Sequence, residues 1–245
     1  MIPKIIHYCW FGGKEKPESV KRMIDSWKKS CPDFEIKEWN ESNYDIDKHP
    51  FMRLAKERGK WSFVSDYARL DILYENGGIY LDTDVELLKS LEPLCSYKGF
   101  IGFERDDLVN DGQGFGGERG LPVLKEMLAV YDEKSFEYGF VESPILRTEV
   151  LSRHGLVKDG KEQTVADMRI LPKDYLCPRN YYTGRIEITD NTYGIHYYDG
   201  TWKNKKEKRY EGLMRFLCKT FGIKTGHRLF EKLMIFKDRI RGRHV

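Results

Sequence analysis

Hydrophobic and polar positions follow two different periods in the first 40 residues. Residues 2–11 (IPKIIHYCWF) are largely apolar, as in a buried strand, and residues 34–39 (FEIKEW) alternate as a half-buried strand does. Between them, a segment from about residue 17 to the residue before Pro32 places apolar side chains at helical spacing. A strand, a helix and a second strand in this order predict an α/β fold.

A second helix is predicted over residues 62–76, and it leads into the most informative part of the chain. Its apolar stripe consists of Phe63, Tyr67, Leu70 and Tyr74. Gly77 and Gly78 end the helix, and the short apolar run 79–81 that follows predicts a buried strand. That strand runs directly into Asp82-Thr83-Asp84.

The remaining pattern predicts further elements on both sides of a glycine-rich stretch at residues 112–120. Strands are predicted near residues 99–104, 168–171 and 193–198, and helices over residues 122–131 and 144–153. From residue 203 onward, apolar residues recur every three or four positions between basic ones. Gly222 and Gly226 predict a break between two short helices there.

Charge is distributed unevenly along the chain. Residues 203–245 hold 14 Lys/Arg and 4 Asp/Glu, a net charge of +10, whereas the first 202 residues carry a net charge of −7. A basic amphipathic end on a mildly acidic body predicts a tail with an anionic partner of its own. Nucleic acid is disfavoured as that partner, because the basic residues are confined to the end and no recognition motif accompanies them.

Composition narrows the class of protein. Hydrophobic residues make up 40% of the 245 positions and charged residues 33%, with both signs balanced, which excludes a disordered chain, a coiled coil and a collagen-like repeat. No run approaches the roughly 18 apolar residues of a spanning helix, and the first residues lack the features of a secretory signal. Five scattered cysteines without a C-x-x-C pair argue against a disulfide framework or a structural zinc site, and favour a reducing cytoplasm.

Two D-x-D triplets occur in the sequence, and their surroundings separate them. With 18 aspartates in 245 positions, about one such triplet is expected by chance. Asp45-Ile46-Asp47 lies in a polar stretch with no buried strand before it, and we interpret it as a solvated loop. Asp82 and Asp84 follow a Gly-Gly break and a buried strand, and residues i and i+2 of an extended segment face the same way.

The second triplet therefore predicts a metal site. Two carboxylates at the carboxyl end of a strand form an open site of hard oxygen ligands, which Mg²⁺ and Mn²⁺ prefer and which leaves positions for phosphate oxygens. Strand ends of this kind are also where open α/β sheets bind their ligands. The alternative is a pair of loop carboxylates that only cap the following turn.

The surrounding segment, WSFVSDYARLDILYENGGIYLDTDVE, resembles the DXD-containing sugar-binding region of glycosyltransferase family 32. That family includes bacterial polysaccharide glycosyltransferases and yeast-type mannosyltransferases, and the clostridial glucosylating toxins share its motif layout. The resemblance extends over roughly residues 1–202 and is most specific in residues 61–86. It implies a GT-A fold, in which residues 1–202 are an α/β catalytic domain and residues 203–245 a basic helical extension.

The resemblance also implies roles for individual residues. Trp10 would stack on the nucleotide base and Cys9 would lend backbone contacts, whereas Ser65, Asp66 and Arg69 would hold the ribose and sugar of the donor. Without the resemblance, Asp66 and Arg69 at i, i+3 would be taken as an exposed ion pair on a helix. The positions expected to flank the nucleotide in addition are Tyr80, Leu81, Asp82 and Thr83.

The segment GIHYYDGTW at residues 194–202 resembles the late His…Trp segment of the family. It implies that His196 is a third metal ligand beside Asp82 and Asp84, and that Trp202 closes over the donor phosphates. The middle of the chain departs from the family pattern, at residues 110–116 (NDGQGFG) and 142–144 (ESP). Both segments would line the sugar and acceptor side, so the resemblance does not identify the donor sugar.

Members of the family transfer a sugar with retention of anomeric configuration. The resemblance implies Mn²⁺ or Mg²⁺ as cofactor, acting as a Lewis acid on the leaving diphosphate, with Asp82, Asp84, Arg69 and Glu142 as the catalytic set. Arg69 and Lys203 would add positive charge near the leaving group. Front-face transfer needs no dedicated base; Glu142, Asp111 and Asp199 are the candidates for a nucleophile or a sugar-binding carboxylate.

The expected donor is a nucleotide sugar, UDP-linked, such as UDP-galactose, UDP-glucose or UDP-N-acetylglucosamine. The expected acceptor is an oligosaccharide or a lipid-linked saccharide in the biosynthesis of cell-surface polysaccharide. A cytoplasmic location follows, with residues 203–245 either in peripheral contact with the anionic inner face of the membrane or packed on the domain with a solvated basic face.

Two other classes of function use the same carboxylate pair. One is a Mg²⁺-dependent phosphoryl- or nucleotidyl-transferase, which lacks support because the chain has neither G-x-x-x-x-G-K-[ST] nor G-x-G-x-x-G after its first strand. The other is a non-catalytic binder of nucleotides or carbohydrates on the same scaffold.

Overall fold

The computed structural model describes residues 1–136, 138–200 and 205–240, and the side chains of residues 205, 207 and 236–240 lie outside this description. Contacts divide the chain into two compact units. The first unit comprises Met1–Pro178 and Ile188–Tyr197, and the second comprises Arg179–Glu187 and Tyr198–Val245. The division predicted from the sequence, with a catalytic domain up to residue 202 and an extension after it, remains a prediction.

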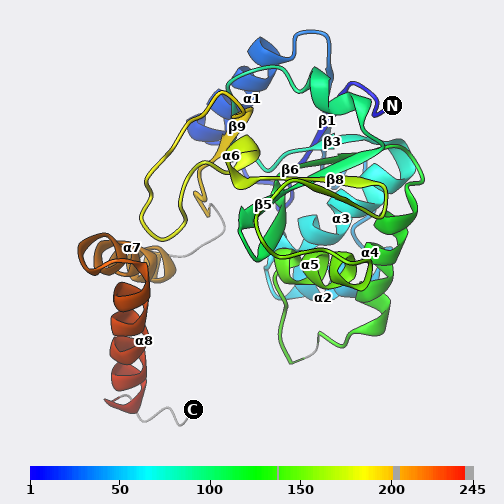
Figure 1. The fold of residues 1–245 in the computed structure, drawn as a ribbon. Helices are drawn as coiled ribbons and strands as arrows, with labels where there is room; N and C mark the ends of the chain where they lie inside the picture. Colours follow the sequence, from blue (N-terminus) through cyan, green and yellow to red (C-terminus); the bar gives the residue numbers. More distant parts are fainter. Residues whose placement is uncertain (137, 201–204, 241–245) are drawn as a thin grey trace. The chain divides into compact units, whose positions relative to one another are not determined.

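A mixed seven-stranded sheet forms the centre of the first unit (Figure 1). Its strands, in chain order, are β1 (Ile5–Cys9), β2 (Glu35–Trp39), β3 (Gly78–Tyr80), β5 (Gly99–Arg105), β6 (Leu108–Gly117), β7 (Gln163–Val165) and β8 (Met168–Leu171). Their order across the sheet is β2-β1-β3-β6-β5-β8-β7. β1 pairs in parallel with β2 and β3, and β6 is antiparallel to both β3 and β5.

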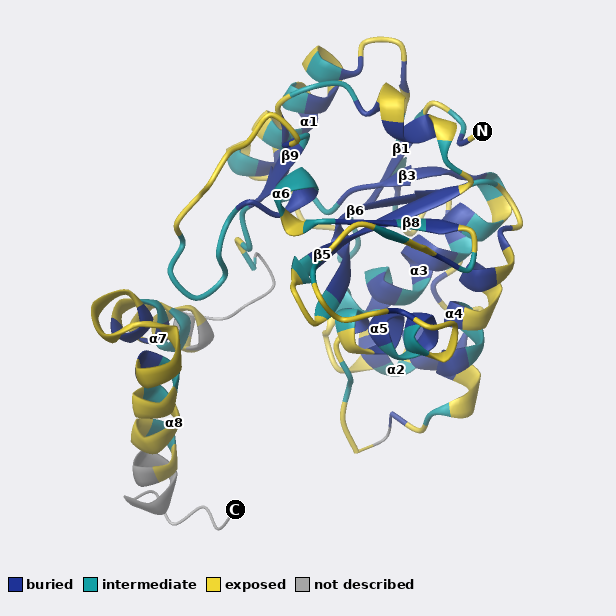
Figure 2. Cartoon of the chain, viewed as in Figure 1, coloured by how far each residue is buried: buried dark blue, intermediate teal, exposed yellow. Residues whose placement is uncertain are grey.

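Helices cover both faces of this sheet, so that the first unit has three layers (Figure 1). The helices are α1 (Glu18–Ser30), α2 (Pro50–Glu57), α3 (Trp61–Asn76), the 3₁₀ turn η1 (Glu92–Ser96), α4 (Pro122–Glu133), α5 (Ser143–Arg153) and α6 (Lys173–Leu176). Alternate side chains of the strands enter two cores: Tyr80 and Ile101 join the one with α2 to α5, and Ile79 and Phe100 join the one with α1. Figure 2 shows the strands buried between the helices.

The strands and helices predicted over the first unit are present, and the mixed α/β architecture is confirmed. Several elements of the first unit escape the sequence pattern, and the two longest of them are β6 and α2. Residues 108–117, which include much of the predicted glycine-rich stretch, form the long strand β6, and the unpredicted helix α2 covers Pro50–Glu57. Asp45 and Asp47 are exposed in a turn, as predicted, where Asp47 pairs with Lys56.

A separate two-stranded antiparallel ribbon joins β4 (Val85–Leu87) to β9 (Gly194–His196). Its register places Val85 opposite His196 and Leu87 opposite Gly194. Trp27 of α1 holds the ribbon in place, because its indole N–H donates a hydrogen bond to the Val85 carbonyl at 2.7 Å. The ribbon therefore brings a segment near residue 196 beside the end of the D-x-D strand.

The second unit consists of the helices α7 (Lys205–Phe221) and α8 (Ile223–Ile240) with the segment Arg179–Glu187. The helix break lies at Gly222, with a φ of +79°, whereas Gly226 lies inside α8; the prediction that both glycines separate the helices is wrong for Gly226. A Cβ on Gly226 would lie 2.5 Å from the Cα of Cys218, so glycine lets the two helix backbones approach closely. Arg215 ties α7 to the short segment by donating to the Tyr181 carbonyl at 3.2 Å.

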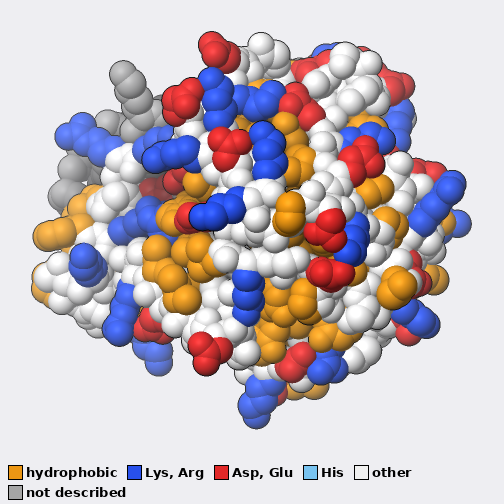
Figure 3. All heavy atoms as spheres, turned by 90° about the horizontal axis from the view of Figure 1, so that it is seen from above, with side chains coloured by type: hydrophobic (Ala, Val, Ile, Leu, Met, Phe, Trp, Pro, Cys, Tyr) orange, Lys and Arg blue, Asp and Glu red, His pale blue; other side chains and the backbone are white. Residues whose placement is uncertain are grey.

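Surface properties of the described residues agree with a chain of mixed charge. On the face shown in Figure 3, basic and acidic side chains are intermixed, with hydrophobic side chains visible between them. Among the helices that the structure describes, none is both long and apolar enough to cross a membrane.

His7 is a fully buried histidine in strand β1, and its hydrogen bonds define its tautomer. The Trp39 indole N–H donates to Nδ1 at 3.0 Å, so Nε2 carries the proton and donates to the Gly77 carbonyl at 2.9 Å. Burial lowers the pKa of His7 from 6.5 to about 4. The neutral ring is therefore part of the fold.

This pKa predicts an acid-sensitive stability. Between about pH 6.5 and pH 4 the unfolded chain binds a proton at His7 that the folded chain does not, so the contribution present above pH 6.5 is lost as the pH falls. It amounts to about 3 kcal/mol over that window. Urea unfolding at several pH values should show a shallower loss of stability for His7→Gln, whose amide retains a donor and an acceptor. Equal slopes for the two proteins would contradict the assignment.

Candidate active site

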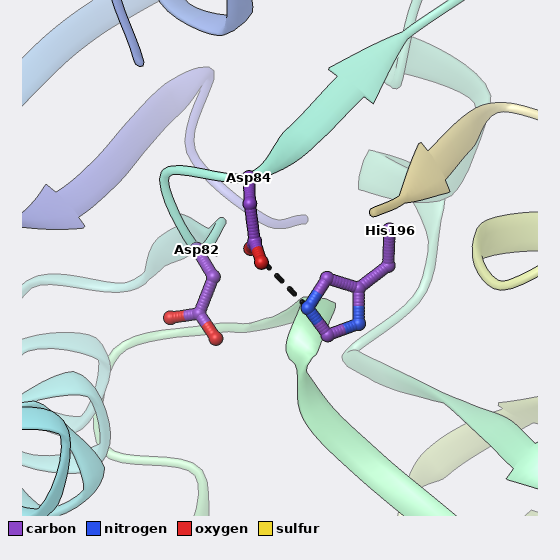
Figure 4. A group of neighbouring side chains, drawn as sticks. All are labelled: Asp82, Asp84 and His196. Carbon is purple, nitrogen blue, oxygen red and sulfur yellow. Dashed lines mark ion pairs between the residues drawn. The ribbon is translucent and has the colours of Figure 1, made fainter. Parts of the chain in front are cut away.

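Three potential metal ligands, far apart in sequence, meet at the end of β3. Asp82 and Asp84 follow this strand, and the Asp82 amide donates to the Gly112 carbonyl of β6 at 3.0 Å. The β4–β9 ribbon then brings in His196, since the Tyr197 amide donates to the Asp84 carbonyl at 2.9 Å. Asp82, Asp84 and His196 each offer a ligand atom, and these atoms lie within 4.8 Å of one another (Figure 4).

Asp84 and His196 face each other within this group. Oδ1 of Asp84 lies 3.2 Å from Nε2 of His196, and Figure 4 shows the Asp84 carboxylate pointing at the imidazole ring. Burial by itself would lower the pKa of His196, but the neighbouring Asp84 carboxylate outweighs burial and raises the pKa. The raised pKa favours a proton on the imidazole, and a cation bound between Asp84 and His196 would replace that proton.

Arg69 is the central cation of the site and contacts three carboxylates. From α3, its Nη2 lies 3.0 Å from Oδ1 of Asp82 and 3.1 Å from Asp66, and its Nη1 lies 3.1 Å from Oδ1 of Asp111. Its Nε donates to the Ser65 carbonyl at 3.2 Å. The Arg69 side chain is only 4% exposed, so little water reaches these ion pairs to screen the attraction between their charges.

Burial raises the pKa of both Asp66 and Asp82, and Arg69 opposes the rise for both. The pKa of Asp66 reaches about 7, which leaves this carboxyl able to donate as well as accept a hydrogen bond near neutral pH. Tyr80 adds a further contact, because its hydroxyl donates to Oδ1 of Asp82 at 3.1 Å. The first aspartate of the D-x-D is thus held from two sides.

A second arginine lies behind Arg69. Arg147 of α5 has no exposed surface, and its Nε donates to Oδ2 of Asp111 at 2.7 Å. Its Nη2 donates to the Asp66 carbonyl at 2.8 Å and to the Tyr131 hydroxyl at 2.9 Å. Burial would raise the pKa of Asp111, yet Arg147 and Arg69 outweigh it and lower the pKa.

Glycine at position 112 provides the space that Asp82 occupies. A Cβ added there would lie 2.2 Å from Oδ2 of Asp82 and 3.2 Å from Nη1 of Arg69. The Gly112 amide itself donates to Oδ1 of Asn110 at 2.6 Å. Strand β6 therefore fits against the carboxylate only because this position lacks a side chain.

The charges of the group fit a divalent cation. Asp66, Asp82, Asp84 and Asp111 supply four carboxylates against the two guanidinium groups of Arg69 and Arg147, a formal excess of two negative charges when all are ionised and His196 is neutral. Two carboxylates and an imidazole are suitable ligands for Mn²⁺ or Mg²⁺. The residues present therefore fit the implied metal.

The other predicted site residues differ in exposure. Trp10, Ser65 and Thr83 are half-buried, whereas Leu81 is fully buried in the core, with its amide donating to the His7 carbonyl. Burial raises the pKa of Cys9 to about 12, so its thiol is neutral. Their contacts with a nucleotide stay predictions.

Glu142 is exposed at the N-cap of α5, next to Ser143, whose hydroxyl donates to Asp111 at 2.7 Å. Its catalytic role stays a prediction. Asp111 is fully buried and held by two arginines, an arrangement that favours a positioning role over that of a nucleophile. Trp202 and Lys203 lie outside the described residues.

Arg147 is a site residue that sequence reasoning missed. The only sign of it is an arginine in the apolar pattern of residues 144–153, where a surface position is the simpler interpretation. Its role depends on the pairing of β6 with β3 and on the packing of α5, neither of which has a local signature.

The fold of the chain is of the GT-A type. The PaToxG glycosyltransferase structure is similar, with a TM-score of 0.50 and 20% identity, over 62% of this chain and 69% of that chain. Residues 17–101 match the family described as "Glycosyltransferase sugar-binding region containing DXD motif". This match covers about a third of the chain and agrees with the resemblance.

Two curated relatives come from Schizosaccharomyces pombe (strain 972 / ATCC 24843). Inositol phosphoceramide mannosyltransferase 3 is 28% identical over 148 residues, which are 57% of this chain and 40% of the relative. Inositol phosphoceramide mannosyltransferase 1 is 25% identical over 153 residues, 57% of this chain and 45% of the relative. The chain thus spans less than half the length of the curated relatives it matches.

The fit at Gly112 predicts a selective defect. Gly112→Ala should displace the Asp82 carboxylate and weaken Mn²⁺ binding by about tenfold or more, because one ligand leaves its place. Calorimetric titration of Mn²⁺ measures the effect. Gly117→Ala in the same strand is the control, since its Cβ would meet only leucine side chains at 3.3 Å and beyond. Unchanged Mn²⁺ affinity in folded Gly112→Ala would contradict this account.

The buried Arg147–Asp111 pair predicts a large stability effect. Arg147→Met leaves Asp111 with one guanidinium fewer in a dry environment and should lower the free energy of unfolding by about 3–5 kcal/mol. Arg153→Met on the same helix removes an exposed i, i+4 partner of Glu149 and should change it by less than about 1 kcal/mol. Urea unfolding compares the two; similar losses would show that Arg147 is not a buried anchor.

Proposed function

We propose that this chain is a metal-dependent retaining glycosyltransferase that transfers a hexose from a nucleotide sugar to a saccharide acceptor. The observation that carries the proposal is the convergence of Asp82, Asp84 and His196 beside Arg69, within a region that matches the DXD sugar-binding family. Retention of configuration comes from the family resemblance, and the anomeric configuration of the product measures it.

Asp82, Asp84 and His196 would hold the metal, which supplies Lewis-acid stabilisation of the leaving diphosphate. Arg69 has a supporting part, because its donors are already engaged by Asp66, Asp82 and Asp111. It contributes a fixed positive charge and holds Asp82 in place. Such preorganised charge avoids reorganisation during transfer.

Asp66 is the residue of this group suited to a sugar hydroxyl. Its carboxyl is 12% exposed, and its pKa near 7 lets it accept or donate a hydrogen bond. The Arg147–Asp66 carbonyl contact keeps the backbone of Asp66 in place. Hydroxyl recognition by one or two such contacts is how hexoses that differ at single positions are separated.

The nucleotide and the sugar are separate parts of the proposal. A UDP-linked donor is the expectation from the family resemblance, with Trp10 stacking on the base. The names of the two fission yeast relatives instead favour mannose as the transferred hexose. Titration of UDP and GDP, each with and without Mn²⁺, separates these, because a preference for GDP would support a mannosyl donor.

The acceptor proposed is an oligosaccharide or a lipid-linked saccharide of cell-surface polysaccharide biosynthesis, with the enzyme in the cytoplasm. Each of the five cysteines is buried and none forms a disulfide, which supports a reducing compartment. The yeast relatives, named as acting on inositol phosphoceramide, support an acceptor with a lipid anchor.

Substitution of both aspartates tests the activity against its alternatives. Asp82→Asn with Asp84→Asn removes both anionic metal ligands, so Mn²⁺-dependent nucleotide binding should disappear and sugar transfer should fall by at least about 100-fold. Asp45→Asn with Asp47→Asn is the matched control, because it makes the same change in the exposed D-x-D loop.

The measurements are calorimetric titration of UDP and GDP and a transfer assay with radiolabelled nucleotide sugars. Nucleotide affinity that persists without metal and without turnover would favour a non-catalytic binder. Release of sugar 1-phosphate with transfer of the nucleoside monophosphate group would favour the nucleotidyl-transferase. Either result would overturn the proposed function.

A further inference from the structure

Exposed hydrophobic side chains are concentrated on the two helices of the second unit. Of the 14 large hydrophobic side chains exposed among the described residues, seven lie within residues 213–235 of α7 and α8. These seven are Leu213, Phe216, Phe221, Ile223, Leu229, Leu233 and Ile235. Phe216 is 63% exposed and Phe221 53%. Single exposed apolar residues need no explanation, but such a concentration does.

The same helices expose an excess of positive charge. Seven basic side chains are exposed in this part of the chain, whereas Glu231 is its one exposed acidic side chain among those described. The seven are Lys206, Lys208, Arg209, Lys219, Lys224, Arg228 and Lys232. Over the part of α8 whose side chains are described, Figure 2 shows most residues as exposed. We call these seven basic and seven hydrophobic side chains the α7–α8 surface.

Hydrophobic and basic positions are interleaved on this surface. Lys219 and Lys224 flank Phe221 and Ile223 at the helix break, and Lys232 adjoins Leu233. The close approach of α7 and α8 at Gly226 leaves the outer faces of both helices available. Aromatic and aliphatic groups beside ammonium groups match an anionic bilayer, whose acyl region takes the former and whose headgroups pair with the latter.

We propose that the α7–α8 surface docks this chain onto anionic lipid bilayers. Phe216 and Phe221 enter the boundary between headgroups and acyl chains, and the lysines pair with lipid phosphates. Nucleic acid would pair with the lysines but leave the aliphatic residues in water, and a second copy of this chain would bring like charges together. Neither nucleic acid nor a second copy of this chain accounts for both the hydrophobic and the basic side chains of the surface.

The test uses the full chain and vesicles of phosphatidylcholine alone or with 30% phosphatidylglycerol, separated by flotation. The full chain should float with the anionic vesicles, weakly with the neutral ones, and less as salt rises. Lys208→Glu with Lys219→Glu and Lys232→Glu should lower partitioning at least about 100-fold. Phe216→Ser with Phe221→Ser should lower it about tenfold or more at unchanged charge.

Each variant has a matched control on the first unit. Lys29→Glu with Lys125→Glu and Lys158→Glu makes the same change in net charge at exposed lysines, and Val157→Ser with Ile188→Ser removes exposed apolar side chains. Both controls should float as the unmodified chain does. Circular dichroism of every variant verifies that α7 and α8 remain folded.

Several results would overturn the proposal: no flotation of the folded full chain, equal flotation with both vesicle types, or equal losses in the control variants. Dimerisation that disappears in Phe216→Ser with Phe221→Ser, without vesicle binding, would instead identify a second copy as the occupant. The test is independent of sugar transfer, so it stands whichever donor or activity the first unit has.

Discussion

The guanidinium of Arg69 is the interaction on which the rest of the site depends. It lies almost fully buried between Asp66, Asp82 and Asp111, which come from α3, the end of β3 and β6. Carboxylates at such short range and low exposure would repel one another strongly without a shared cation. Arg69 therefore lets three segments meet at one point, and the chain places the D-x-D at that point.

Arg69 cannot hold this position alone, because its own burial has to be compensated. Asp111 pairs with both Arg69 and Arg147, and Arg147 in turn fixes the backbone of α3 through the Asp66 carbonyl. The result is an alternating series of charges from α5 to the D-x-D. Such a series is stable only as a whole, since removal of one member leaves its neighbours buried without compensation.

The sequence predicts those parts of the fold that have a local period or a clear break. The helix that carries Asp66 and Arg69, its glycine stop and the strand before Asp82 all have such signatures. Strand β6 has no such signature, because its glycines are unfavourable in a strand pattern. They are needed for close packing: a Cβ on Gly116 would lie 2.6 Å from the side chain of Phe100. Helix α2 is short and follows a polar loop, so its period is too brief to predict it.

The candidate site likewise contains residues that the sequence predicts and residues that it does not. Asp82, Asp84, Asp66 and Arg69 lie in one predicted helix–strand segment, and the resemblance adds His196. Arg147 and Gly112 could not be found, because their roles depend on contacts between segments distant along the chain. A local sequence pattern does not show which residues from distant segments come into contact, even where each residue stands out in its own segment.

Charge balance connects this architecture to the proposed chemistry. The two arginines neutralise only half of the four carboxylates, and the pKa values of Asp66, Asp82 and His196 are all raised, so the protonated forms of these three groups are favoured relative to the free side chains. A divalent ion would displace those protons, so metal binding and the ionisation of the site are linked. Because Arg69 already satisfies one oxygen of Asp82, it orients the carboxylate whose other oxygen lies over Gly112. The two buried arginines thus hold the carboxylates in a site that keeps a net negative charge, which the metal of the proposed function would require.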